Sequence, residues 1–293
     1  MRYKILGIGE VLWDLLPSGP QLGGAPANFV YHAQSMGADA ELISRVGRDQ
    51  LGEDILSRLS GHGLDVGGIQ LDDRAPTGTV SVKLSHGQPH YIIHENVAWD
   101  FIGLREGVLE EVRNADALCF GSLAQRGAVS CRSIQKLAAA APKNVLRVFD
   151  INLRQHFYSE EIIRRSLVLA NVLKLNDAEL PPLAGMFRLS GGVQEQLAQL
   201  AKMFQLEVVA LTRGQRGSLL YSDGRWSDHP GIPVMVKDTI GAGDAFTAAL
   251  VMGLLRKTPL DKINERANQL ASYVCSQEGA MPFPSKLVPQ AVA

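Results

Sequence analysis

Short apolar runs alternate with longer amphipathic stretches along most of the chain. Each run has the length of a buried strand, whereas most of the stretches between them repeat with the period of a helix. The predicted strands are Ile5–Gly9, Glu41–Val46, Ala117–Phe120, Val145–Phe149, Val172–Leu175 and Val208–Leu211, and the predicted helices include Asp49–Leu59, Ala128–Ala140, Glu160–Ala170 and Val193–Phe204. This alternation predicts an α/β fold, with a doubly wound, mainly parallel sheet flanked by helices.

One region has a different period. Residues 77–84 (TGTVSVKL) and 89–95 (PHYIIHE) alternate polar and apolar positions with period two around a short turn. This pattern predicts an antiparallel hairpin, which does not easily join a parallel core. We therefore expect a small β-sheet lid, made by lid segments at about residues 10–21 and 75–101. The lid belongs to a single α/β domain over residues 1–293, and it suits an enzyme that must exclude water.

Composition narrows the class of protein. The chain has 293 residues, 46% of them hydrophobic and 20% charged, which is a globular profile. Its formal charge of −1 gives no basic excess for binding nucleic acid or anionic lipid, so a small-molecule partner is expected. The longest nearly apolar stretch, residues 245–255, is about half of what spans a bilayer.

The cysteines indicate a cellular compartment. Cys119, Cys131 and Cys275 form no CxxC pair and are odd in number. They are typical of buried small hydrophobic residues in a reducing compartment, and the expected localisation is cytoplasmic.

The strongest local signal is the segment 238–246 (DTIGAGDAF), which leads into a helical pattern. Its glycines allow backbone N–H groups to turn toward one point, and a helix N-terminus adds its positive end, so an anion cradle for phosphate is predicted. Phosphoryl transfer needs a carboxylate that accepts the proton of the attacking hydroxyl, and Asp244 is the candidate. The helix dipole is expected to lower the pKa of Asp244. The alternative is that Asp244 only caps the helix.

A second glycine-rich segment, residues 23–28 (GGAPAN), opens another helix. By itself this is an ordinary Gly-Pro start of a helix. Asp14, however, follows the first predicted strand, at the edge where open α/β sheets bind ligands. Because an Asp and an Asn at strand-to-helix junctions can bind the hydroxyls of a polyol, Asp14 and Asn28 are candidate ligands.

Three further polar segments follow predicted strands. They are residues 150–154 (DINLR), 176–179 (NDAE) and 212–217 (TRGQRG), the last of which is placed to lie along phosphates. Each alone is more often turn chemistry, but together they put polar groups on one rim of the sheet.

Two other patterns are weak. The spacing of His86, His90 and His94 would align them on a helix and suggest a metal site, but a glycine and a proline between them forbid that helix. On a hairpin only His90 and His94 share a face, so a lid-surface role is favoured. No Walker-type phosphate loop occurs, and the segment 7–9 lacks the rest of a dinucleotide-binding fingerprint.

Taken together, these segments resemble the ribokinase (PfkB-type) family of carbohydrate kinases, over nearly the whole chain and in the same order. The resemblance rests mainly on residues 23–55, GGAPANFVYHAQSMGADAELISRVGRDQLGEDI, and 238–250, DTIGAGDAFTAAL. Within the family, GGAPAN, ENVAWD (residues 95–100) and DINLRQ (residues 150–155) look most like the fructokinase branch. The resemblance implies ATP-dependent phosphorylation of a sugar hydroxyl with Mg²⁺.

The resemblance also implies roles for individual residues. Asp244 would be the catalytic base, and the backbone N–H groups of Gly241, Ala242 and Gly243 would form the anion hole. The sugar ligands would be Asp14, Gly24 and Asn28, with Arg154 reaching the substrate or the transferring phosphate, although Arg154 equally suits an ion pair with Asp150 or Glu179.

For the nucleotide, Asn176 and Glu179 match the family's N-x-x-E element, which helps to organise Mg²⁺ and phosphate, so Glu179 would be an indirect Mg²⁺ ligand. Thr212, Gly214 and Gly217 match its nucleotide loop. Members of the family often hold a monovalent cation through the positions of Asp238 and the Ile240 carbonyl, with others near Gly279, so the resemblance also suggests K⁺.

The identity of the sugar is less constrained. Ribokinases carry a Lys-Gly pair where this chain has Ala25-Pro26, which favours a hexose. Fructose, converted to fructose 6-phosphate, is the expected substrate, and ketodeoxygluconate, tagatose, ribose or another ketose or sugar acid are alternatives. A nucleoside is less favoured, although Tyr91, Trp99 and Phe101 offer rings for stacking.

Other functions remain open. The alternatives of a different class are a non-catalytic sugar or nucleotide sensor on the same fold and a redox enzyme on a similar sheet. The edges of an exposed lid sheet also need cover, so we expect a homodimer formed through the lid.

Overall fold

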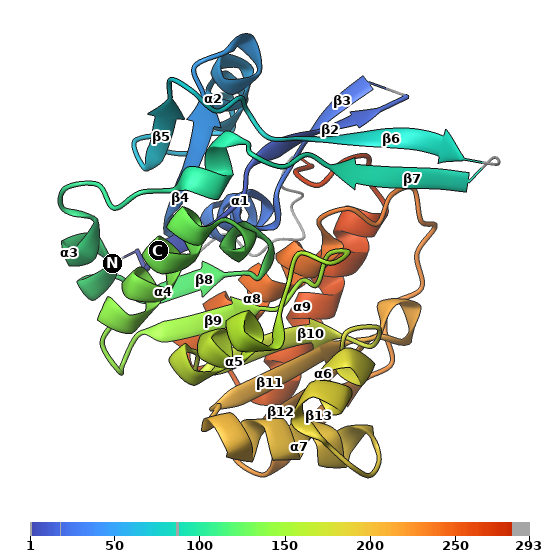
Figure 1. Ribbon diagram of the computed structural model, residues 1–293. Helices are drawn as coiled ribbons and strands as arrows, with labels where there is room; N and C mark the ends of the chain where they lie inside the picture. Colours follow the sequence, from blue (N-terminus) through green and yellow to red (C-terminus); the bar gives the residue numbers. More distant parts are fainter. Residues whose placement is uncertain (1, 18, 86–87, 283–293) are drawn as a thin grey trace.

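The main sheet of this computed structural model, which describes residues 2–17, 19–85 and 88–282, has the strand order β13-β12-β11-β10-β9-β8-β1-β4-β5. Figure 1 shows this sheet running through the body of the molecule. Its strands are β1 (Lys4–Ile8), β4 (Asp39–Gly47), β5 (Ile69–Asp72), β8 (Ala117–Phe120), β9 (Leu146–Asp150), β10 (Val172–Asn176), β11 (Val208–Thr212), β12 (Ser218–Ser222) and β13 (Arg225–His229).

The strands from β5 to β11 are parallel, and β12 and β13 add an antiparallel edge. Strand β1 pairs with β4 on one side and with β8 on the other, so the chain changes direction across the sheet at β1. In open α/β sheets, ligands bind beyond the carboxyl ends of the strands at such a switch point. The predicted fold class is confirmed.

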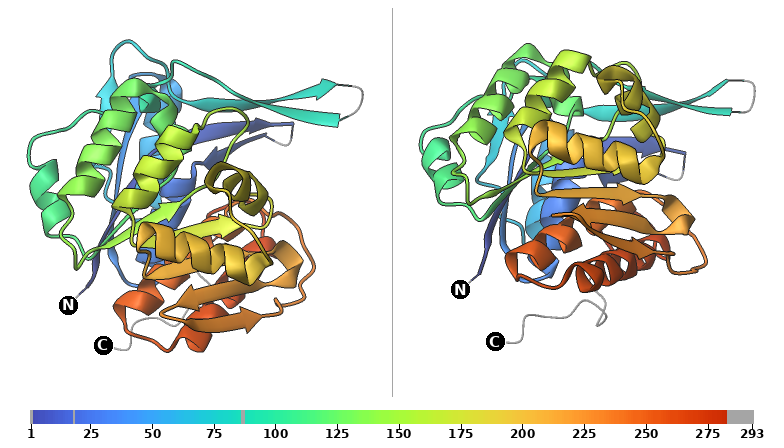
Figure 2. Two further views of the ribbon diagram at one scale, coloured as in Figure 1. Left: turned by 60° about the horizontal axis from the view of Figure 1, so that its bottom comes forward. Right: turned by 90° about the horizontal axis from the view of Figure 1, so that it is seen from below.

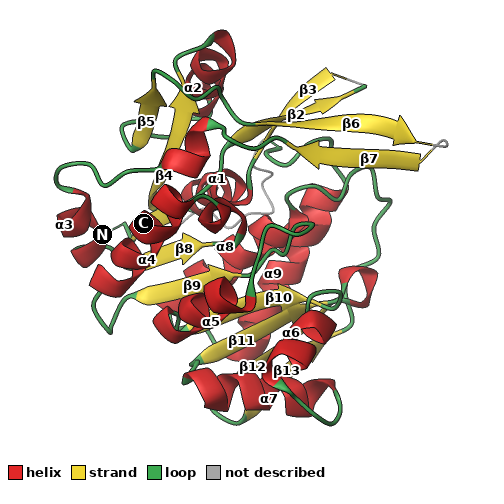
Figure 3. Ribbon diagram, viewed as in Figure 1, coloured by secondary structure: helices red, strands yellow, loops and turns green. Residues whose placement is uncertain are grey.

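Helices cover both faces of the main sheet, as Figures 2 and 3 show. Side chains on successive strand positions point to opposite faces, so the sheet has two core clusters. Ile8 belongs to the cluster that includes residues of α3 to α7, and Ile5 to the cluster that includes residues of α1, α2, α8 and α9. The helices are α1 (Ala25–Ser35), α2 (Gln50–Gly61), α3 (Val108–Arg113), α4 (Ala128–Ala140), α5 (Glu160–Leu169), α6 (Leu180–Phe187), α7 (Val193–Phe204), α8 (Ala242–Leu255) and α9 (Leu260–Cys275).

A small separate sheet lies beside the carboxyl edge of the main one and projects beyond it in Figure 1. Its strand order is β3-β2-β6-β7, with β2 (Leu12–Leu16), β3 (Gly19–Gly23), β6 (Thr79–Ser85) and β7 (Gln88–Ile93). The hairpins β2–β3 and β6–β7 are antiparallel, whereas β2 and β6 pair in parallel. The strands fall in the two expected lid segments, extended by two residues at Gly23.

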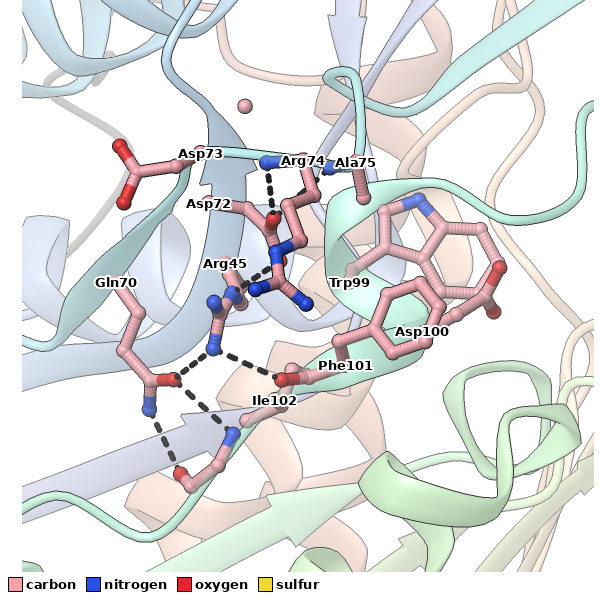
Figure 4. A network of polar contacts seen from close by, with 12 residues as sticks. Arg45, Gln70, Asp72, Asp73, Arg74, Ala75, Trp99, Asp100, Phe101 and Ile102 are labelled. Atoms are coloured by element: carbon pink, nitrogen blue, oxygen red, sulfur yellow. Dashed lines mark hydrogen bonds and ion pairs between the residues drawn. The ribbon is translucent and has the colours of Figure 1, made fainter.

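A polar network holds the two ends of the second lid segment together (Figure 4). Arg45 on β4 forms an ion pair with Asp72 at 2.7 Å and donates a hydrogen bond to the carbonyl of Phe101. The Asp72 carboxylate also accepts the backbone N–H groups of Arg74 and Ala75, where the chain leaves for the small sheet. The base of this sheet is therefore tied to β4 and β5 both where the chain enters the segment and where it returns.

Several observed elements have no counterpart among the predicted ones. They are β5, α3, α6, the hairpin β12–β13 and α9. Strand β13 reads RWSDH, with no apolar run, because it forms the exposed edge of the sheet. Over the described residues, none of the helices combines the length and the hydropathy that crossing a membrane requires.

Candidate active site

Asp244 lies in the first turn of α8 and faces α1. The N-cap of α8 is Gly241, whose φ of 77° is left-handed and favours glycine, and no side chain caps this helix. The alternative that Asp244 is only a cap is therefore wrong. Instead, its Oδ2 accepts a hydrogen bond of 2.7 Å from Nδ2 of Asn28. Two residues that are far apart in the sequence thus meet at the site.

The pKa of Asp244 is raised to about 6. Burial is the main cause, and the charge of Asp150 adds to it, while Lys174, Asn28 and Arg154 oppose the rise. The lowering expected from the helix dipole is outweighed, because losing hydration penalises the ionised carboxylate more than the helix end favours it. A carboxyl group with this pKa is ionised at neutral pH and is a stronger base than an ordinary aspartate.

The turn before α8 has the form of an anion cradle. The N–H groups of the first helical turn lack carbonyl partners within the helix, and Gly241 to Gly243 bring several of them together. The N–H of Ala242 also makes a long contact of 3.4 Å with the carbonyl of Thr239. A Cβ on Gly241 would approach Ala280 to 2.6 Å, and one on Gly243 would lie 3.0 Å from Nζ of Lys174. Glycine is therefore required at position 241, both for its left-handed backbone and for its close approach to Ala280.

A buried lysine lies under this turn. Nζ of Lys174, on β10, forms an ion pair of 3.1 Å with Oδ1 of Asp150 at the end of β9. Oδ2 of Asp150 accepts a hydrogen bond of 2.8 Å from the hydroxyl of Thr247 on α8, and this bond ties the helix to the sheet. Burial lowers the pKa of Lys174, but Asp150, Glu179 and Asp244 together raise it above its ordinary value. Lys174 therefore provides a fixed positive charge beneath the cradle.

The start of α1 forms the other side of the site. Gly24 is its N-cap, with a φ of 112°, and a Cβ there would overlap the carbonyl of Glu10. Pro26 occupies the first turn, as the Gly-Pro start predicted. Asp14, on β2, packs its carboxylate against Gly23. Burial is the main cause that raises the pKa of Asp14 to about 6. The charge of Arg154 opposes this rise, and the charge of Asp238 adds to it.

Arg154 faces the acidic residues of the site. It is exposed, and its guanidinium donates a hydrogen bond of 3.2 Å to the carbonyl of Leu153, the preceding residue. Its charge opposes the rise in pKa of Glu10, Asp14 and Asp244 alike. The alternative of an ion pair with Asp150 is not seen, because that carboxylate is occupied by a lysine and a threonine.

The predicted N-x-x-E element is a closed turn at the end of β10. Oδ1 of Asn176 accepts the N–H groups of Ala178 and Glu179. The buried Glu179 carboxylate accepts the N–H groups of Asn176 and Leu153, and so links the ends of β9 and β10. Burial raises the pKa of Glu179. The element thus fixes the rim of the site, and Glu179 is not an outward-facing carboxylate.

The predicted nucleotide loop follows β11. Thr212 pairs with Asn176 across β10 and β11, so this loop lies beside the N-x-x-E turn. Gly214 and Gly217 have φ of 57° and 73°, and a Cβ on Gly217 would overlap the backbone at residues 229–231. Glycine is required at Gly217 for close backbone approach as well as for its conformation.

The expected monovalent-cation residues lie next to the cradle. Oδ1 of Asp238 accepts the N–H of Ile240 at 3.0 Å, and Oδ2 accepts the N–H of Gly279 at 3.2 Å. Asp238 therefore brings the segment near Gly279 against the start of α8. Within the described parts of the chain, no cluster of three or more His, Cys, Asp or Glu side chains is arranged to hold a metal ion.

The histidine pattern is described only in part. His86 lies outside the described residues, and His94 at the end of β7 has its Nε2 3.0 Å from the hydroxyl of Ser81. Gln155 donates a hydrogen bond of 2.7 Å to the carbonyl of Tyr91, and Arg126 donates one to the carbonyl of His94. Strand β7 is therefore joined to the loops that follow β8 and β9.

Three residues at the site were missed by sequence reasoning. Glu10 was regarded only as the start of a lid segment, and Lys174 and Thr247 only as parts of a strand and a helix. Lys174 carried a signal, since a lysine inside an otherwise apolar strand (VLKLN) requires a buried partner. Thr247 carried none, because a threonine within a helix is common.

The fold and the site define an α/β protein that gathers carboxylates and a glycine-rich helix start at one edge of its sheet. The model of the pfkB family of carbohydrate kinases matches residues 20–286. The chain therefore belongs to the pfkB family of carbohydrate kinases, and it is a sugar kinase of that family.

Similar proteins agree with this assignment. A fructokinase of Klebsiella pneumoniae is 31% identical over 92% of this chain and 91% of its own. An uncharacterized sugar kinase of Pyrococcus horikoshii, PH1459, is 31% identical over 96% of this chain and 93% of its own. A structure of PH1459 with ATP has a TM-score of 0.80 and covers 94% of both chains at 29% identity.

A fructokinase of Vibrio cholerae with fructose, ADP and calcium has a TM-score of 0.81, with 99% of this chain and 96% of that one covered. Its identity is 24%, so the likeness is one of fold.

Proposed function

We propose that the protein transfers the γ-phosphoryl group of ATP to a hydroxyl of fructose, forming fructose 6-phosphate. The observation that carries this proposal is the contact between Asn28 and Asp244 beside the glycine turn of α8. It puts a base with a raised pKa next to backbone donors suited to phosphate. The name of the Klebsiella relative supports fructose.

In this proposal Asn28 fixes the orientation of the Asp244 carboxylate by bonding Oδ2, which leaves Oδ1 to accept the proton of the sugar hydroxyl. Asp14 and the backbone at Gly24 bind other hydroxyls, and Arg154 balances the negative charge of the site. The N–H groups of Gly241 to Gly243 bind the transferring group. Lys174 holds this turn in place from below.

ATP and Mg²⁺ fit the residues present. The helix start is suited to an anion, and the turn Gly214–Arg216, which follows Thr212 and is exposed, is open to phosphates. When bound, ATP supplies the phosphoryl group and Mg²⁺ screens its charge, with Asn176 and Glu179 organising the rim. A structure of the related sugar kinase PH1459 contains ATP, which supports ATP as the phosphoryl donor. K⁺ would bind at Asp238 and the Ile240 carbonyl.

The test is ADP release from Mg²⁺-ATP, with and without K⁺, in the presence of fructose, ribose, tagatose, ketodeoxygluconate or adenosine. Fructose is expected to give the highest kcat/KM. Asp244→Ala should lose nearly all turnover while still binding sugar. Asp261→Asn is the matched control, since Asp261 is an exposed aspartate in the first turn of α9. Full turnover by the Asp244 variant would remove it as the base.

The same assay separates the alternatives. If the protein prefers another sugar, the assigned substrate changes but the phosphoryl-transfer reaction stands. Sugar binding without transfer to any acceptor would favour a sensor.

A homodimer formed through the small sheet is a further part of the proposal. Strands β3 and β7 are its edges, and Leu15, Tyr91 and Ile92 on it are large exposed apolar residues. A concentration-independent monomer mass in light scattering would contradict it.

A further inference from the structure

Glu10 is a buried carboxyl group at the junction of the two sheets. It lies between β1 of the main sheet and β2 of the small one, and its exposed fraction is 3%. Among the described residues, its Oε2 has no hydrogen-bond partner. Buried polar groups are nearly always hydrogen-bonded, so this oxygen requires a partner that the protein does not supply.

The carboxyl group of Glu10 lies at the N-terminal end of α1, which the proposed function assigns to sugar binding. The backbone N–H of Ala25 is one of the groups that stabilise the charge of this carboxylate. The residue at position 24 must be glycine, because a Cβ there would overlap the backbone carbonyl of Glu10. Asn28, one turn further along α1, gives its Nδ2 to Asp244 and leaves its own Oδ1 buried and unpartnered. Two unpartnered oxygens thus line the same helix end, next to the base.

The charges around Glu10 are those of the catalytic site. Burial raises its pKa to about 7, Asp244 adds to the rise, and Arg154 and the N–H groups of Glu10 and Ala25 oppose it. Near neutral pH the carboxyl group therefore exists in both forms, one that accepts hydrogen bonds and one that also donates. A hydroxyl group suits both forms, because it is itself a donor and an acceptor.

We propose that Glu10 is a specificity-determining ligand of the sugar, hydrogen-bonded through its carboxyl group to a second hydroxyl near the one that Asp244 deprotonates. This inference rests on the proposed function. It also favours neutral sugars over sugar acids, because a substrate carboxylate would meet the three acidic groups of Glu10, Asp14 and Asp244. Arg154 offsets the charge of all three, and Lys174, which is itself paired with Asp150, offsets that of Asp244.

The experiment measures binding of fructose and of its singly deoxygenated derivatives by calorimetry, without nucleotide. Glu10→Ala should weaken binding of fructose by about 10- to 100-fold. For one deoxy derivative, the one that lacks the hydroxyl bound by Glu10, the wild type and Glu10→Ala should bind equally. Glu10→Gln keeps a hydrogen-bonding group and should stay within a few fold of the wild type. Glu53→Gln, on the exposed face of α2, is the control.

Equal losses for every derivative would show a structural role and overturn the inference, as would unchanged binding of fructose. If the alanine variant fails to fold, Glu10→Asp, which retracts the carboxyl group by one methylene, is compared in the same way. Sugar binding with this pattern but without phosphoryl transfer would overturn only the kinase proposal. No binding of any sugar would overturn both.

Discussion

Replacing Asp244 by Asn should abolish turnover and stabilise the fold. The pKa of this carboxyl group rises from 3.8 to about 6 on folding, mainly through burial. Two pKa units, at about 1.4 kcal/mol each, correspond to about 3 kcal/mol by which the ionised form destabilises the folded protein at pH 7. Asparagine carries no charge, and its Oδ1 still accepts the hydrogen bond from Asn28. The gain in unfolding free energy should therefore be about 1–3 kcal/mol.

The gain should depend on pH in a defined direction. Above pH 6 Asp244 is ionised in both folded and unfolded chains, so the full penalty applies to the wild type. As the pH falls from about 6 to about 4, the folded protein takes up the proton first, and the penalty disappears. The difference between the wild type and Asp244→Asn should therefore be largest at pH 7 and vanish near pH 4.

Urea denaturation followed by tryptophan fluorescence, at pH values from 4 to 8, measures this difference. Asp261→Asn again serves as the control, because that aspartate is exposed at the start of a helix and its charge should favour the fold slightly. An Asp244→Asn variant that is less stable than the wild type at pH 7, or a difference that does not change with pH, would refute the reasoning.

Other variants test the rest of the site. Lys174→Met should lower the unfolding free energy by about 3–5 kcal/mol, because it leaves Asp150 as a buried, uncompensated charge. Adding Asp150→Asn should recover most of this loss in urea denaturation; no recovery would argue against the pair. Gly24→Ala should raise the KM for sugar more than tenfold, since its Cβ would overlap Glu10, and an unchanged KM would contradict this. The kcat/KM of the wild type should decrease as the pH drops below 6, because Asp244 becomes protonated. A kcat/KM that stays constant down to pH 5 would contradict the role of Asp244 as the base.

Much of the fold was predictable because its signals are local. Buried parallel strands read as short apolar runs, and most helices between them show their period, so most elements up to β11 followed from the pattern, β5, α3 and α6 excepted. The small sheet was predictable as a hairpin for the same reason. Its parallel pairing of β2 with β6 was not, because no local signal tells which strand of one hairpin lies beside the other.

The candidate site was predictable in its residues more than in its contacts. Gly241 and Gly24 carry their own signal, since few other residues adopt their backbone conformations. The pKa of Asp244 was predicted in the wrong direction. The helix dipole is readable from its position in the sequence, whereas burial depends on every element that covers it.

By itself, the sequence determined the class of fold, the two glycine turns and the family, because each rests on residues that are close together in the chain. Only the tertiary structure decided that Asn28 bonds Asp244, that Lys174 pairs with Asp150, and that Glu10 lies buried without a partner. These facts depend on which strand ends and helix starts meet at one edge of the sheet. Hydrogen bonds and burial act through space, and distance along the chain does not record them.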